Sequence, residues 1–295
     1  MRVSRIYTQQ LLNSGATVTL GEEISHYVLR VLRLRRGDPL ILFNGDGSEY
    51  QAILSKADRS QAAALIGQAD KPHRESALRV FLGQGLARGE RMDFVLQKST
   101  ELGAVSITPL WTNRCQVQLS GKRLANRLAH WQGILRSACE QSNRVVLPGL
   151  DKPTPLPEWL AAVQEQQHKL VLDPSATRRL RDLPPASSVS ILVGPEGGLD
   201  EDEIRLSESN GFQRIRIGPR VLRTETAAVA ALAAVQTLWG DLRARCSADR
   251  HRLFQTSSIN VCIASRSGIK ASAVSSSMQS ATVVGRFLSA RSDAP

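Results

Sequence analysis

The chain contains few of the residues that hold metal ions or form disulfide frameworks. Only four cysteines and five histidines occur among its 295 residues. The cysteines form no CxxC pair and the histidines are scattered, which argues against structural zinc and against a disulfide framework. We therefore expect no metal ion, and thiols that are buried or incidental. The cysteines are Cys115, Cys139, Cys246 and Cys262.

Long hydrophobic runs are also missing. No apolar stretch approaches the roughly 20 residues that a membrane-spanning helix needs. The N-terminal residues reach the polar pair Gln9-Gln10 without the hydrophobic region of a secretion signal. The sequence therefore predicts a cytoplasmic protein with no membrane partner. At 42% apolar residues the chain can still bury one or two hydrophobic cores.

Acidic residues are outnumbered by basic ones, 27 to 38, which gives a formal net charge of +11. Residues 245–295 contain seven Lys or Arg and two Asp or Glu, a net +5, which leaves +6 for residues 1–244. This excess suggests a polyanionic partner, but charge alone does not establish nucleic-acid binding.

Two nucleotide-binding motifs are absent. The chain has no GK[ST] sequence, which excludes a P-loop. Residues 83–88, GQGLAR, imitate the start of a dinucleotide fingerprint, but Arg88 occupies the position of the third glycine. No acidic residue ends a second strand about 20 residues later, so the pattern argues against a nicotinamide cofactor.

Residues 1–72 are typical of a small, mostly β module. Two apolar runs, 40–43 and 50–54, flank a Gly-rich turn and predict a hairpin, and 62–66 continues the strands. Residues 24–34 favour a helix whose arginines point away from its apolar side. The polar residues 71–75 predict a domain boundary.

From Leu78 onward, predicted strands and helices alternate, which indicates an α/β domain at 75–243 with a largely parallel sheet. The last helix is Ala-rich and apolar around most of its circumference, which favours burial or a subunit interface. Residues 245–295 are Ser-rich and basic, and we expect them to be a disordered tail. The expected strands are 78–83, 104–110, 168–173, 188–194 and 212–217, and the expected helices are 89–102, 121–142, 156–167, 200–210 and 224–242.

The most informative motif is ILVGPEGGLDEDE at residues 191–203. An apolar strand ends at Val193, and the glycines that follow allow backbone amides and carbonyls to touch a ligand. At Gly197 we expect close approach to the ligand and a positive φ. The acidic residues 200–202 suit the first turn of a helix. Acid at that turn argues against phosphate and favours a neutral or cationic ligand.

Two further segments also carry motifs that packing alone does not explain. KSTELG at 98–103 is a helix end with a glycine cap. IGPRVLRTETA at 217–227 leads from a strand end into the Ala-rich helix, where Thr224 is expected to be the N-cap without a capping box. Capping does not explain why Arg220, Arg223 and Glu225 gather around a Gly-Pro turn. Loops after parallel strands share one crevice, so we expect 194–200 and 217–227 to meet there.

In this order the three motifs resemble the SPOUT class of S-adenosylmethionine-dependent RNA methyltransferases, and more closely its RsmE family, the 16S rRNA (uracil-N3)-methyltransferases. The resemblance extends from residue 1 to about 243, and the chain beyond 245 departs from it. Supporting matches are RIY at 5–7, HYVLRVLR at 26–33, GD at 37–38, FNG at 43–45 and EQSNR at 140–144.

The resemblance implies an α/β fold of SPOUT type with a deep C-terminal trefoil knot, preceded by a small PUA-like β-barrel. It implies a homodimer whose active sites borrow residues from the partner subunit. S-adenosylmethionine is the implied methyl donor, without a metal, and 16S rRNA within the small ribosomal subunit is the implied substrate. The implied donor-binding residues are Leu172, Val193, Gly194, Pro195, Glu196, Gly197, Gly198, Ile217, Gly218, Leu222, Thr224 and Ala227.

Methylation at uracil N3 requires loss of a proton from that nitrogen. Glu225 is the candidate base, and Arg223 is the candidate cation for the negative charge that develops on the uracil. The alternative is that the two side chains only pair with each other. The RNA contacts that we expect are Arg5, His26, Arg30, Arg33, Arg114 and Arg144. For arginines of the 26–36 segment, a solvated helix face is the alternative.

Two other functions remain open at this point. One is a SPOUT methyltransferase that acts on tRNA or on another rRNA site. The other is a non-catalytic RNA-binding relative, against which the intact GPEGG and RTETA sequences argue.

Overall fold

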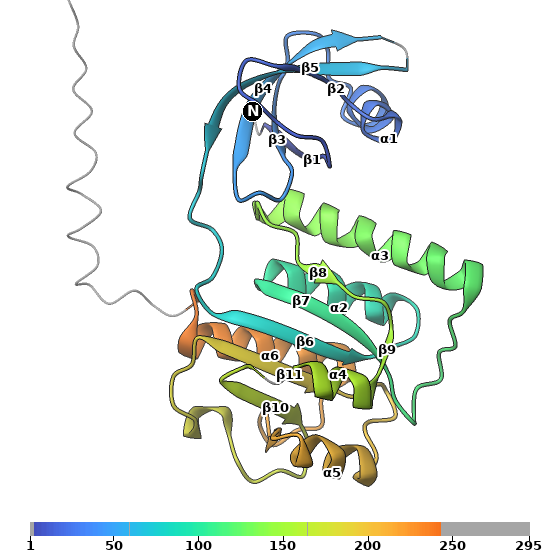
Figure 1. Ribbon diagram of the computed structural model, residues 1–295, viewed down its shortest axis with the longest axis vertical. Helices are drawn as coiled ribbons and strands as arrows, with labels where there is room; N and C mark the ends of the chain where they lie inside the picture. Colours follow the sequence, from blue (N-terminus) through green and yellow to red (C-terminus); the bar gives the residue numbers. More distant parts are fainter. Residues whose placement is uncertain (1–2, 59, 164, 243–295) are drawn as a thin grey trace, which may run out of the picture. The chain divides into compact units, whose positions relative to one another are not determined.

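The structure is a computed structural model that describes residues 3–58, 60–163 and 165–242 (Figure 1). The predicted tail at 245–295 lies outside the described residues. Two sheets, each with its own hydrophobic core, make up the described part of the chain.

The N-terminal sheet has five strands in the order β1-β3-β4-β5-β2. Along β4, Ala52 and Leu54 are buried and Ile53 is exposed, which is the alternation expected of a sheet with one face on a core. The predicted hairpin is confirmed by the antiparallel pairing of β3 with β4. The strands are β1 (Ser4–Tyr7), β2 (Thr17–Thr19), β3 (Pro39–Phe43), β4 (Glu49–Ala57) and β5 (Ala62–Asp70).

The helix that we predicted over 24–34 is shorter in the structure. Helix α1 (Glu22–His26) continues into a π-helical turn, η1 (Tyr27–Val31), and the helical backbone then ends. Arg33 follows with a φ of 55°, a left-handed conformation that cannot continue a right-handed helix. Val28 is the buried anchor of this segment in the N-terminal core.

The second sheet has the order β12-β10-β11-β6-β7-β8, and all of its paired strands are parallel, as predicted. Strands β8 (Gly149–Leu150) and β9 (Thr154–Pro155) were not predicted, because two residues are too few to show a periodic pattern. The predicted strands appear as β6 (Arg79–Gly85), β7 (Ala104–Trp111), β10 (His168–Leu172), β11 (Ser188–Val193) and β12 (Gln213–Ile215).

All five predicted helices of this domain form; α2 and α5 are one residue shorter at each end than expected, and α4 and α6 end several residues early. Helix α4 ends at Ala162 because Val163 leaves the helical conformation, and α6 ends at Trp239 before Gly240. The helices are α2 (Glu90–Glu101), α3 (Gly121–Ser142), α4 (Leu156–Ala162), α5 (Glu201–Ser209) and α6 (Thr224–Trp239).

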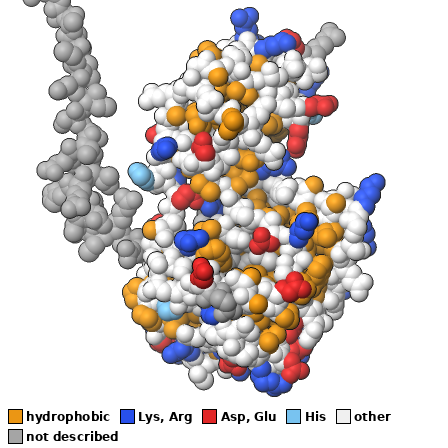
Figure 2. Space-filling view, in the orientation of Figure 1, with side chains coloured by type: hydrophobic (Ala, Val, Ile, Leu, Met, Phe, Trp, Pro, Cys, Tyr) orange, Lys and Arg blue, Asp and Glu red, His pale blue; other side chains and the backbone are white. Residues whose placement is uncertain are grey.

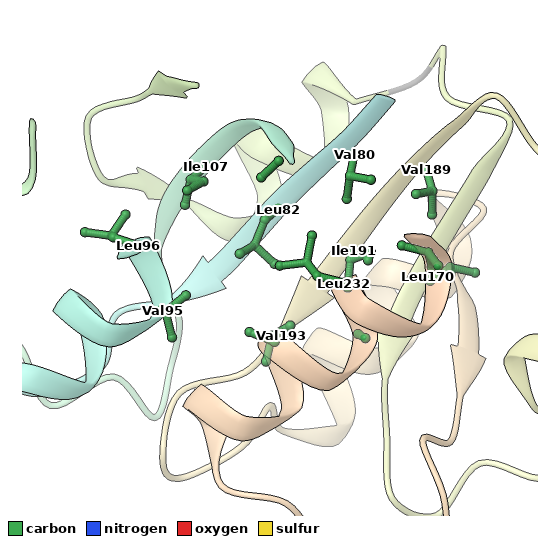
Figure 3. Close-up of a cluster of buried hydrophobic side chains, with 14 of the residues drawn as sticks. Val80, Leu82, Val95, Leu96, Ile107, Leu170, Val189, Ile191, Val193 and Leu232 are labelled. Atoms are coloured by element: carbon green, nitrogen blue, oxygen red, sulfur yellow. The ribbon is translucent and has the colours of Figure 1, made fainter. Parts of the chain in front are cut away.

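The main core lies between this sheet and the helices on it (Figure 3). Leu82 from β6, Ile191 from β11 and Leu170 from β10 are buried beside Leu232 from α6. Because the central strands are covered on both faces, β11 is buried from Val189 to Val193 without alternation, as is usual in parallel sheets. This rigid centre holds the strand ends from which the site loops emerge.

The described ranges hold neither a candidate membrane span nor a candidate metal cluster. Within residues 3–58, 60–163 and 165–242, no helix has the length and hydropathy to span a membrane. The same ranges contain no group of three or more His, Cys, Asp or Glu side chains that could hold a metal ion.

Candidate active site

A cleft of about 520 Å³ opens at the carboxyl ends of β10, β11 and β12. Most of its wall consists of the loops that follow these strands and the first turn of α6, and α2 and α5 contribute further residues. This volume falls within the range of small-molecule sites, and strand ends of parallel sheets are where such sites form. All twelve predicted donor-binding residues line the cleft, as do Arg223 and Glu225.

The loop after β11 depends on its glycines for different reasons. A Cβ on Gly194 would lie 2.9 Å from the backbone nitrogen of Leu199, so only glycine lets the loop fold back on itself. Gly198 has a φ of +71°, a conformation that favours glycine. Gly197 has no such φ, contrary to our expectation. Its Cβ would instead approach Cβ of Arg114 at 3.1 Å.

The acidic residues after this loop start α5 as predicted. Asp200 is the N-cap and accepts a hydrogen bond from the Glu203 amide, while the Glu203 carboxylate accepts one from the Asp200 amide. Hydrogen bonds from the Glu203 amide and from the Asn113 side chain lower the pKa of Asp200. The capping box therefore occupies amides that a phosphate ligand would need.

Thr224 connects the two site loops. We predicted it as the N-cap of α6, but Arg223 occupies that position and Thr224 is the first helical residue. Its hydroxyl is then released from capping, donates to the Gly194 carbonyl at 2.6 Å and accepts from Nε2 of Gln84 at 2.8 Å. Thr224 is buried, so these hydrogen bonds fix the start of α6 against the loop after β11 and the end of β6.

Glu225 and Arg223 both line the cleft but differ in environment. Oε2 of Glu225 is buried and has no hydrogen-bond partner among the described residues. Arg223 is exposed, and the two side chains form no ion pair with each other. The alternative that they only neutralise each other has no support here. An unpartnered buried carboxylate oxygen is a group that a cationic ligand or a substrate N–H would satisfy.

The sequence analysis missed some charged residues of the cleft wall, among them Asp173 and Arg91. Burial raises the pKa of Asp173, but hydrogen bonds from the amide and hydroxyl of Ser175 and from Arg214 outweigh it, so the pKa is lowered. Arg91 donates to Glu196 at 3.0 Å. Asp173 directly follows β10, and its position after a strand end could have indicated that it lies in the cleft. Arg91 belongs to α2, and no neighbouring sequence motif predicts that it lines the cleft.

The pKa of Glu196 is also lowered. Burial acts to raise it, but hydrogen bonds from the Arg88 amide and from Arg91 have the larger combined effect. Glu196 is thus held as an anion at the rim, where it ties the loop after β11 to the start of α2.

The third motif, Lys98–Gly103, does not line the cleft. It ends α2, with Gly103 at a φ of +80° and the Leu102 carbonyl accepting from Nε2 of Gln236 in α6. Its role in the described structure is the glycine stop that the sequence pattern also allowed.

The predicted RNA contacts divide into two groups. His26, Arg30 and Arg33 are exposed on α1, on η1 and just beyond it. Arg114 is exposed beside the cleft and donates to the Gly197 carbonyl at 3.1 Å. These four remain candidates for RNA contact.

Arg5 and Arg144 are buried, and this removes them from the predicted RNA contacts. The Arg144 guanidinium donates to the carbonyls of Thr100 and Ala104, both at 2.9 Å, and pairs with Glu75 at 2.7 Å. Arg5 pairs with Glu49 and donates to the Arg144 carbonyl at 3.0 Å. Both side chains are only 6% exposed, so their positive charges are used inside the protein.

Comparisons with known proteins find relatives of both parts of the chain. The model of an RNA methyltransferase domain matches residues 74–236, and that of an RNA methyltransferase PUA domain matches residues 20–66. The chain is 35% identical to ribosomal RNA small subunit methyltransferase E of Buchnera aphidicola subsp. Schizaphis graminum, over 82% of this chain and 98% of that protein.

Two solved structures are similar over almost their whole length. One is a putative methyltransferase from Legionella pneumophila in complex with the bound cofactor SAM, at 39% identity and a TM-score of 0.79, covering 82% of this chain and 100% of that one. The other is ribosomal RNA small subunit methyltransferase E from Neisseria gonorrhoeae bound to S-adenosyl methionine, at 40% identity and a TM-score of 0.77, covering 81% and 99%.

The two domain matches define an RNA methyltransferase with a PUA domain and a fold of the SPOUT type. Within that class, the chain belongs to the ribosomal RNA small subunit methyltransferase E family.

Proposed function

We propose that this protein transfers the methyl group of S-adenosylmethionine to N3 of a uridine in 16S rRNA. We further propose that it acts in the cytoplasm, as a homodimer, on the small ribosomal subunit. The observation that carries the proposal is the cleft, where the loop residues implied by the family resemblance line one cavity. Two relatives at 39% and 40% identity were solved with this donor.

The residues of the cleft fit the donor. Leu172, Val193 and Leu222 supply apolar walls for an adenine, and the loop around Gly194 supplies backbone groups for its polar edge. The unpartnered Oε2 of Glu225 lies in the same cleft, where an N–H of the substrate base would satisfy it. When bound, S-adenosylmethionine supplies a methyl group on a positively charged sulfur.

The chain's own residues then act on the uracil. Glu225 accepts the N3 proton, so the nitrogen lone pair becomes available as a nucleophile. Such a base contributes about 10²–10⁴-fold to the rate. Arg223 stabilises the negative charge that spreads onto the uracil oxygens. The target base has to be unpaired or turned out of a helix to reach these groups.

The proposal includes the two architectural features of the family. A homodimer would cover α6, whose outer face leaves Leu238 40% exposed at the end of a helix that is apolar on most sides. A trefoil knot would hold the loops 194–200 and 217–223 together around the donor. The bond between Thr224 and Gly194 supports a fixed relation of these two loops.

The test is methylation in vitro with a donor that carries an isotopically labelled methyl group. Small ribosomal subunits, naked 16S rRNA and tRNA are incubated with the purified protein, and modified nucleosides are mapped by mass spectrometry. We expect labelled N3-methyluridine at one position of 16S rRNA. Label in tRNA alone would support another SPOUT activity, and absence of both label and donor binding would support a non-catalytic relative.

A further inference from the structure

Helix α3 has an outer surface with no acidic side chain. Its only acidic residue, Glu140, faces inward, where burial raises its pKa and one of its oxygens accepts a hydrogen bond from the Tyr7 amide at 2.9 Å. The remaining ionisable side chains of this 22-residue helix, apart from the buried Cys139 thiol, are basic. They are Lys122, Arg123, Arg127, His130 and Arg136.

The middle of α3 contacts α2, the helix that carries Arg91 of the cleft wall. Asp93 of α2 accepts a hydrogen bond from Nε1 of the buried Trp131 at 3.2 Å and lies 2.8 Å from Nε2 of His130. Two residues before Asp93, Arg91 lines the cleft and pairs with Glu196. The basic helix α3 therefore packs on the same helix, α2, that contributes Arg91 to the cleft wall.

The other end of α3 reaches the segment in which we predicted RNA contacts. Arg136 lies 3.6 Å from Glu23 of α1. A cavity of about 420 Å³ is lined both by Tyr27 and Leu32, and by Glu140 and its neighbours on α3. Figure 1 shows α3 running between the N-terminal sheet and α2. A helix of this length spans about 33 Å, enough to meet several successive phosphates.

The charges at the start of α3 do not stabilise the helix. Lys122 and Arg123 are in its first turn, where the helix dipole favours acidic side chains. Helix α5 follows that rule with three acidic residues in its first turn. Neither Lys122 nor Arg123 forms an ion pair with another described residue, and Figure 2 shows Lys and Arg side chains gathered at this end of α3. An anionic partner would satisfy both the cations and the dipole.

We propose that the outer face of α3 binds the phosphate backbone of the RNA substrate and guides it from α1 to the cleft. This inference rests on the proposed function, in which the substrate is rRNA. It extends the predicted contacts of α1 and η1 by a second, separate element that belongs to the methyltransferase domain.

The test is a triple variant, Lys122→Ala with Arg123→Ala and Arg127→Ala, in the full-length chain. Binding of 16S rRNA is measured at several salt concentrations. Each lost phosphate contact changes the slope of log K against log salt by about 0.7 to 0.9, so we expect the slope to become shallower by about 2. Affinity at low salt should fall by about 10-fold or more, and S-adenosylmethionine affinity should stay unchanged.

A matched control removes three positive charges elsewhere: Lys152→Ala with Arg181→Ala and Arg205→Ala. All three are exposed and none lies on α3. Arg127 also lies 3.9 Å from Asp93, so its loss could disturb the packing of α3 on α2. The double variant Lys122→Ala/Arg123→Ala keeps this pair and shows whether the effect persists without it. An unchanged slope in the α3 variants, or an equal loss in the control, would overturn the proposal. If the unmodified protein neither binds nor methylates 16S rRNA, the proposed function fails instead.

Discussion

The cleft and the domain junction differ in what they are made of. Backbone, small residues and apolar side chains form most of the cleft wall, and its key hydrogen bond joins Thr224 to a main-chain carbonyl. The junction between the N-terminal sheet and the end of α3 is held by charged side chains. It comprises Arg5, Glu49, Arg74, Glu75 and Arg144, which pair with each other and with backbone carbonyls.

This difference shows why arginines in two motifs have different roles. Arg223 follows a glycine loop after a strand end, and it stays exposed at the cleft. Arg144 follows a long helix, and its partner Glu75 lies 69 residues earlier in the chain. A buried guanidinium with a carboxylate and two carbonyls around it fixes architecture, whereas an exposed one beside a cleft is free to meet a substrate.

The largest effect is expected at the junction. Arg144→Leu removes the pair with Glu75 and leaves the carbonyls of Thr100 and Ala104 without their donor. We expect the free energy of unfolding to fall by about 3–5 kcal/mol. Urea denaturation measures this. The exposed Arg205→Leu should change it by about 0.5 kcal/mol or less. A loss below about 1 kcal/mol in Arg144→Leu would contradict a structural role.

A smaller effect, on rate alone, is expected in the cleft. Glu225→Gln should keep the fold and the donor affinity, and should lower turnover by about 10²-fold or more. A higher pH should restore part of this rate, because hydroxide can then remove the N3 proton. Arg223→Ala should lose about as much rate without full rescue. Single-turnover methylation at several pH values separates the two. Glu22→Gln, at an exposed position, is the surface control. Full activity in both cleft variants would show that neither Arg223 nor Glu225 takes part in the reaction.

The smallest effect is a difference in pH dependence. Asp173 in the cleft has a lowered pKa, so its contribution to stability is present above its ordinary value of 3.8 and is lost as pH falls below that value. Glu140 at the end of α3 has a pKa raised by burial. Its contribution is therefore complete below its ordinary value of 4.5 and is lost as pH rises through the folded-state value.

Unfolding free energies between pH 3 and pH 7 check this contrast. The difference between the unmodified protein and Asp173→Asn should shrink toward acid pH. The difference from Glu140→Gln should shrink in the opposite direction, as pH rises. Two differences that change in the same direction would show that Asp173 and Glu140 are not distinguished by their surroundings.

Much of the fold could be predicted because its signals are local. The five predicted strands and five helices of the second domain follow from apolar runs, glycine stops and an acidic N-cap, and the cleft-lining loops follow from their positions after strands. The contacts of side chains such as Arg5, Arg144 and Arg91 could not be predicted, because their partners are distant in the sequence. Gly197 was assigned a positive φ that belongs to its neighbour Gly198, since the motif does not tell two adjacent glycines apart.

The central claim is that the two loops joined by Thr224 form the donor site. Calorimetric titration of S-adenosylmethionine into Thr224→Val tests it most directly, because valine keeps the shape but removes the bonds to Gly194 and Gln84. Thr237→Val is the matched control, since Thr237 is exposed on the same helix and bonds only to Ala233 within it. We predict that donor affinity falls by about 10-fold or more in Thr224→Val, about 1.4 kcal/mol, and is unchanged in Thr237→Val. Unchanged affinity in a folded Thr224→Val protein would contradict the account.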